Sequence, residues 1–207
     1  TAVRMGADDE LTIGVLAQAY LQQHKYKDVL SKVLPGNRTP AIEAAVMGAR
    51  ATAYYELFRY EDARQDFETA RRLAPDDPLP LLGIARVLVR QGKVDEAEAA
   101  VDQAAAINPQ HNDLWYVRGE LFRLRKEYTA AVQAFARCIE LAPSHFPARL
   151  ARASALIQLG RHKEAVEDLN FARDYDRLDP QSAYLLALAL AATGEVDKDA
   201  VLLVRQT

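Results

Sequence analysis

The sequence predicts an all-helical protein of about six tandem helix hairpins, because three markers recur at one spacing. Each is a residue type suited to one place in a hairpin: a proline that stops a helix, a turn residue after a helix, and a small residue where helices meet. The markers are Pro75, Pro109 and Pro143; Gly92, Lys126, Gly160 and Gly194; and Ala63, Ala97, Ala131 and Ala165. A common step of about 34 residues is typical of a helix–turn–helix repeat.

The markers divide the chain into successive units within a single domain over residues 1–207. The units are 10–43, 44–77, 78–111, 112–145, 146–179 and a partial or capping unit, 180–207. We expect first helices over 10–23, 44–57, 78–91, 112–125, 146–159 and 180–193, with second helices between them. Residues 1–9 are expected to be frayed.

The unit at 112–145 shows how a hairpin would pack. Trp115, Gly119 and Phe122 fall on one stripe of the first helix, opposite a second-helix stripe that includes Ala131 and Phe135. The small residues would let the helices approach, while the aromatic side chains fill the space beside them. We therefore expect Trp115 and Phe135 to be among the most buried side chains.

Charged residues also recur in register. Arg50, Arg118 and Arg152 share one first-helix position, where we expect a packed aliphatic stem and a guanidinium that reaches the groove or an acidic neighbour. Asp66, with other carboxylates nearby in sequence, is expected on a solvated helix face.

The aromatic, glycine, alanine and proline pattern resembles the tetratricopeptide repeat (TPR) over nearly the whole chain, most closely at Trp115, Gly119, Phe122, Ala131 and Pro143. The resemblance implies a right-handed α–α superhelix, the TPR solenoid, whose first helices line a concave groove. Transferring the family's groove positions gives Tyr55, Arg86, Arg90, Tyr116, Glu120, Arg123, Ser154 and Ile157 as the candidate partner-binding residues.

Two short segments are similar to a narrower bacterial family, the TPR lipoproteins associated with exosortase (PEP-CTERM) sorting. They are residues 16–30, with Leu16–Gln23 and Tyr26–Leu30, and residues 179–185. This resemblance implies a periplasmic, membrane-tethered scaffold. The alternative is a cytoplasmic protein, and the sequence leaves both open. A chain that begins at Thr1 is expected to be a processed or excised piece, so any membrane contact would be through a removed anchor.

Composition and motifs argue against several classes of function. The formal net charge of −3 disfavours general nucleic-acid binding. Cys138 is the single cysteine, and His24, His111, His145 and His162 fall at expected turns without a helical metal-binding partner. Phosphate-cradling loops and nucleophile elbows are missing. We expect no enzymatic activity, metal, cofactor or small-molecule substrate.

The sequence thus favours a non-catalytic scaffold that binds a peptide or a partner's helix in its concave groove. A row formed by Arg86 and Arg90 is expected to lie beside a row formed by Tyr116, Glu120 and Arg123. Two other functions stay open: a structural component of an assembly or export machine, and an accessory domain of a larger enzyme.

Overall fold

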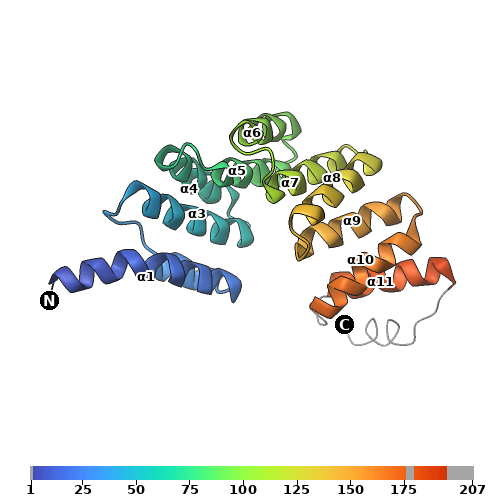
Figure 1. Ribbon diagram of the computed structural model, residues 1–207, viewed down its shortest axis with the longest axis horizontal. Coiled ribbons are helices and arrows are strands. Elements are labelled where there is room, and N and C mark those ends of the chain that lie inside the picture. The colour runs from blue at the N-terminus through green and yellow to red at the C-terminus, as the bar shows by residue number, and fades with distance from the viewer. Residues whose placement is uncertain (1, 176–179, 195–207) are drawn as a thin grey trace. The chain divides into compact units, whose positions relative to one another are not determined.

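A computed structural model describes the backbone of residues 2–175 and 180–194, and the side chains of residues 12–171 and 181–194. Every regular element in these ranges is an α-helix, which confirms the predicted fold class (Figure 1). The helices are α1 (Ala2–Gln22), α2 (Tyr26–Lys32), α3 (Pro40–Glu56), α4 (Tyr60–Leu73), α5 (Pro78–Arg90), α6 (Val94–Ile107), α7 (Asn112–Leu124), α8 (Tyr128–Leu141), α9 (Phe146–Gln158), α10 (His162–Tyr175) and α11 (Pro180–Thr193). None of them is long and apolar enough to cross a membrane.

Odd-numbered helices are the first helices of the hairpins, and even-numbered helices are the second. From Pro78 onward, every first helix begins at the predicted residue. Two earlier first helices begin before the predicted residue. Helix α1 already begins at Ala2, so residues 2–9 are helical, and α3 begins at Pro40, because a proline at the first helical position has its φ angle already set for a helix. The second helix of the last hairpin falls outside the described residues.

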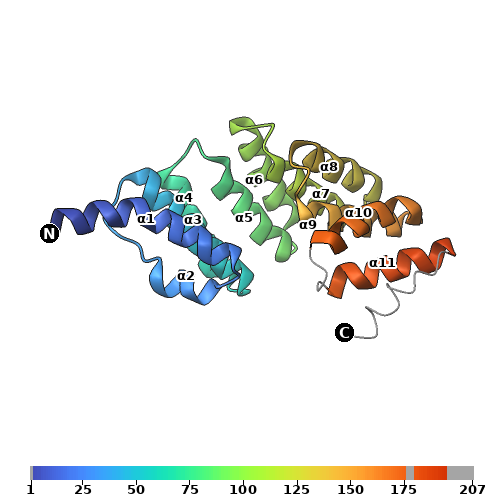
Figure 2. The same ribbon diagram turned by 60° about the horizontal axis from the view of Figure 1, so that its bottom comes forward.

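The chain divides into two compact units, Thr1–Pro109 and Gln110–Thr207. In the first unit, α2 packs against both α1 and α3 (Figure 2), and α3 to α6 pack in chain order. In the second unit, α7 to α11 also pack in chain order. This succession of contacts between neighbours is the packing of a helical solenoid.

A residue with a positive φ angle follows each first helix. These residues share one register: His24 (54°), Phe58 (60°), Gly92 (71°), Lys126 (61°), Gly160 (73°) and Gly194 (79°). The left-handed residue lets the next amide bond back to the helix end, as Lys93 N does to Leu88 O at 2.9 Å. In three turns this residue is not glycine. Among these three, the positive φ angle is least favourable for the bulky Phe58.

Close helix contacts depend on two glycines. A Cβ atom on Gly119 would overlap the ring of Phe135 in the same hairpin, and one on Gly83 would overlap Phe67 of the preceding hairpin. Phe135 is fully buried, as predicted. Trp115 is only half-buried, so the prediction for it was wrong. Phe135 occupies the centre of the core against Gly119, and Trp115 packs at its edge with the Arg118 guanidinium 5.3 Å from its ring centroid.

Two of the recurring arginines bind a buried aspartate on the second helix of their hairpin. Arg50 Nε lies 3.2 Å from Asp66 Oδ2, and Arg152 Nε lies 2.6 Å from Asp168 Oδ2. This confirms the expected acidic neighbour at these positions. Asp66 is buried, so its predicted place on a solvated face was wrong.

Candidate partner-binding surface

Three predicted groove residues meet at one point in the first unit. Tyr55 lies near the end of α3, and Arg86 and Arg90 lie one helical turn apart on α5, which contacts α3. Arg90 Nε donates a hydrogen bond to Tyr55 Oη at 3.0 Å. The Arg86 guanidinium lies over the Tyr55 ring, 4.5 Å from its centroid. The first helices of consecutive hairpins thus hold a tyrosine between two cations.

These contacts position the arginines without burying them. Arg86 also forms a long ion pair with Glu56, at 3.6 Å, with both side chains about one-third exposed. Arg90 is exposed. Both side chains therefore stay at the surface, while the tyrosine limits the directions in which their guanidinium groups can point.

Sequence reasoning missed two aromatic residues that extend this cluster. The ring of Tyr60, at the start of α4, lies 5.8 Å from that of Tyr55, and the ring of Phe58 lies 6.3 Å from that of Tyr60. Phe58 is 77% exposed. We call Tyr55, Phe58, Tyr60, Arg86 and Arg90 the Tyr55 surface. The signal for Phe58 was a large apolar side chain in the register that holds Gly92, Gly160 and Gly194.

The predicted residues of the second unit form a different environment. Arg123 donates two hydrogen bonds to the Glu120 carboxylate, at 3.1 Å and 2.8 Å, so these two charges largely balance each other. The Tyr116 ring lies 6.0 Å from that of Phe135 and 5.2 Å from that of His145. This tyrosine is thus partly taken up by packing within its own unit.

Ser154 and Ile157 are half-exposed on α9. Ile157 also packs against the hydrophobic core that α9 shares with α10 and α11. The predicted juxtaposition of the Arg86–Arg90 row with the Tyr116–Arg123 row stays a prediction.

Two of the histidines and the cysteine have structural contacts. His111 and His145 share a register, and each accepts a backbone hydrogen bond at a helix start, from Asp113 N at 3.2 Å and from Ala148 N at 3.0 Å. Burial, with the nearby charge of Asp113, raises the pKa of the Cys138 thiol to about 12, which disfavours the reactive thiolate at neutral pH. Within the described residues, no group of three His, Cys, Asp or Glu side chains could hold a metal ion.

Comparison with solved structures identifies the fold. A thermophilic TPR protein of Thermus thermophilus superposes with a TM-score of 0.66 at 21% identity, over 79% of this chain and 89% of that one. MamA of Desulfovibrio magneticus RS-1 superposes with a TM-score of 0.59 at 18% identity, over 84% of this chain and 94% of that one. YrrB is described as a TPR protein with an unusual peptide-binding site. It superposes with a TM-score of 0.55 at 18% identity, over 79% of this chain and 84% of that one.

Curated proteins match over shorter fractions of their own length. Human anaphase-promoting complex subunit 7 is 24% identical over 163 residues, which are 76% of this chain and 28% of that protein. Human DnaJ homolog subfamily C member 3 is 24% identical over 161 residues, 70% of this chain and 32% of that protein. The chain therefore spans about a third or less of these relatives.

Family models give the most direct assignment. Three models, each described as a tetratricopeptide repeat, match residues 44–77, 82–146 and 123–189. These ranges run from within α3 to within α11. Together with the helical packing and the solved TPR structures, they show that this chain belongs to the tetratricopeptide repeat family.

Proposed function

We propose that this chain is a non-catalytic scaffold that holds a peptide or a partner's helix against its first helices, with the Tyr55 surface as a principal contact. TPR proteins are generally protein-interaction scaffolds, and the fold provides repeated helix faces on which contacts can be placed. The observation that carries the proposal is the exposed Arg90 bonded to Tyr55, with Arg86 over the same ring.

The chemistry of the Tyr55 surface suggests what it binds. Tyrosine and arginine are the residues that most often anchor protein interfaces. Guanidinium groups pair with carboxylates, and aromatic rings pack against hydrocarbon. Because Tyr55 already orients both arginines, little side-chain freedom would be lost on binding. The proposed ligand is a segment with an acidic side chain beside an apolar one. The peptide-binding site named for YrrB supports a peptide ligand for this fold.

A second candidate function is a subunit role in a large assembly. The matches to subunits of the anaphase-promoting complex favour it, because this chain aligns with part of each subunit. In that case the Tyr55 surface would contact a neighbouring subunit in place of a free peptide.

Affinity capture from cells that contain the protein tests the proposal. Arg90→Glu reverses a charge on the Tyr55 surface, and Arg72→Glu reverses an exposed arginine of the second helix α4 as a matched control. The proposal expects the partner to be lost with Arg90→Glu and retained with Arg72→Glu, while circular dichroism and melting stay unchanged. Retention with Arg90→Glu and loss with Arg72→Glu would overturn it.

A further inference from the structure

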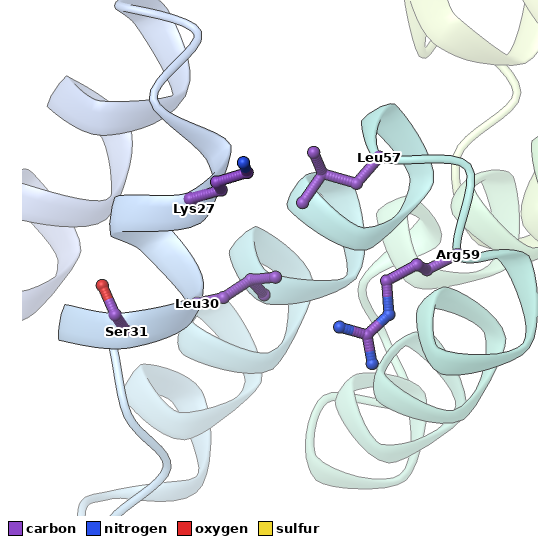
Figure 3. Close-up of a pocket in the computed structure, with 5 residues that line it drawn as sticks. All are labelled: Lys27, Leu30, Ser31, Leu57 and Arg59. Atoms are coloured by element: carbon purple, nitrogen blue, oxygen red, sulfur yellow. The ribbon is translucent and has the colours of Figure 1, made fainter.

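The first unit also contains an open cleft between α2 and the α3–α4 turn. Lys27, Leu30 and Ser31 of α2, together with Leu57 and Arg59 of the α3–α4 turn, line an open cleft of about 460 Å³. Figure 3 shows Lys27 and Leu30 extending from α2 toward Leu57, with Arg59 on the opposite wall. Leu57 caps the C-terminal end of α3, and the lining of the cleft contains none of the five residues of the Tyr55 surface. The cleft is therefore distinct from the Tyr55 surface.

The cleft combines an apolar base with cationic edges. Leu30 packs against the core cluster of α1, α2 and α3 from its outer side, and Leu57 is half-exposed. The lining contains two basic side chains and no acidic one. A bound segment could thus bury an aliphatic side chain between the leucines and place a carboxylate at the edge.

The two cations differ in how they are held. Arg59 is fixed, because its Nε lies 2.8 Å from Asp62 Oδ2 and its guanidinium lies over the Tyr54 ring at 4.5 Å. The acid nearest to Lys27 in sequence, Asp28, is engaged with Lys32 at 2.9 Å. Lys27 is exposed and has no ion pair among the described side chains. Its ammonium group is the cation that an incoming carboxylate would meet.

We propose that this cleft docks a short segment of a partner protein that carries a Leu, Ile or Met side chain close to an Asp or Glu. A macromolecular segment fits better than a small metabolite, because small-ligand sites usually enclose most of the ligand and this cleft is open. The positive edge selects an acidic segment. The proposal stands independently of the Tyr55 surface and gives the scaffold a second contact.

A phage-displayed library of 12-residue peptides, panned on the 207-residue chain, tests the proposal. Selected peptides are synthesised, and their affinities are measured by fluorescence anisotropy against four variants. Lys27→Glu and Leu57→Ala change the cleft, Arg90→Glu changes the Tyr55 surface, and Lys93→Glu is a control at another exposed lysine of the same unit. Among the described side chains Lys27 has no ion pair to lose, so Lys27→Glu leaves the fold intact even if Leu57→Ala perturbs it.

A set of selected peptides should carry an aliphatic residue within four positions of an acid. Their affinity should fall about tenfold or more with Lys27→Glu, and change less than about twofold with Arg90→Glu or Lys93→Glu. The proposal is overturned if no selected peptide is weakened by Lys27→Glu, or if the weakened peptides lack an acid. Self-association that Lys27→Glu abolishes, with no peptide competing, would assign the cleft to a second copy of the chain and would also overturn it.

Discussion

At the scale of single residues, the buried pair Arg50–Asp66 occupies two facing positions of a hairpin that another hairpin fills with apolar residues. In the hairpin that begins at Pro78, the equivalent positions hold Ile84 and Ala100, both buried and apolar. Burial raises the pKa of the Asp66 carboxyl, and the Arg50 guanidinium opposes this only in part. The charged pair therefore costs free energy of folding. The hairpin that begins at Pro78 shows an apolar alternative at the same two positions.

Replacing the pair gives a prediction for stability. Asp66→Ala alone should destabilise the chain by about 3 kcal/mol, because it leaves a mostly buried guanidinium without its carboxylate. Arg50→Ile with Asp66→Ala, copied from the neighbouring hairpin, should be neutral or stabilising. Urea denaturation of both variants checks this. A double variant clearly less stable than the natural chain would contradict it.

The same pair predicts a pH dependence. A carboxyl whose pKa is higher in the folded state contributes stability that is fully present below the ordinary value of 3.8 and is lost as the pH rises through the raised value. The double variant lacks this group. Its stability relative to the natural chain should therefore rise from about pH 3 to neutral pH, as measured by urea denaturation across that range. A stability advantage of the double variant that is larger at acidic pH than at neutral pH would contradict the predicted direction.

The aromatic core gives a second mutational test. Phe135→Ala should cost about 3–5 kcal/mol, because a fully buried ring leaves a cavity against Gly119. Trp115→Ala should cost less, about 1–3 kcal/mol, because Trp115 lies at the edge of the same cluster. Chemical denaturation ranks the two variants, and a larger loss for Trp115→Ala would show that the tryptophan is the main core residue.

Part of the Tyr55 surface was predictable from spacing alone. Arg86 and Arg90 are one turn apart on a helix whose start is marked by Pro78, so their common face follows from helical geometry. The contact of Tyr60 with Tyr55 depends on how the turn at Phe58 folds, which spacing does not reveal. The burial of Asp66 was missed for a similar reason. Its partner Arg50 lies on the other helix of the hairpin, whereas charge patterns along the sequence relate residues of one helix.

At the scale of the helix and turn, proline and glycine explain why most boundaries could be predicted. Pro78 and Pro180 start helices, and Gly92, Gly160 and Gly194 adopt the left-handed conformation that ends them. The start of α1 at Ala2 has no such marker in the sequence.

The turn at Phe58 gives a prediction at this scale. Phe58→Gly should stabilise the chain by up to about 1 kcal/mol, since glycine adopts a positive φ angle without the strain of a side chain. Gly92→Ala, in the same register, should destabilise it by about 1 kcal/mol or more. Thermal melting of both variants tests the pair. A loss of stability in Phe58→Gly would show that the exposed ring contributes to folding more than the turn costs.

At the scale of the whole molecule, contacts between sequence neighbours dominate, as expected for a chain of repeats. The 34-residue register predicted the order of the hairpins in the part of the chain that the structure describes, because each marker has a fixed place in one of them. The division into two compact units was not predicted from the sequence, because the period is the same on both sides of it.

The proposed function requires that a partner binds this repeat chain through the Tyr55 surface. Hydrogen exchange of the full chain, measured with and without the captured partner, tests it most directly. We expect added protection at the ends of α3 and α5, over residues 52–60 and 84–91. Protection confined to the second helices α4 and α6, with residues 52–60 and 84–91 unchanged, would contradict it.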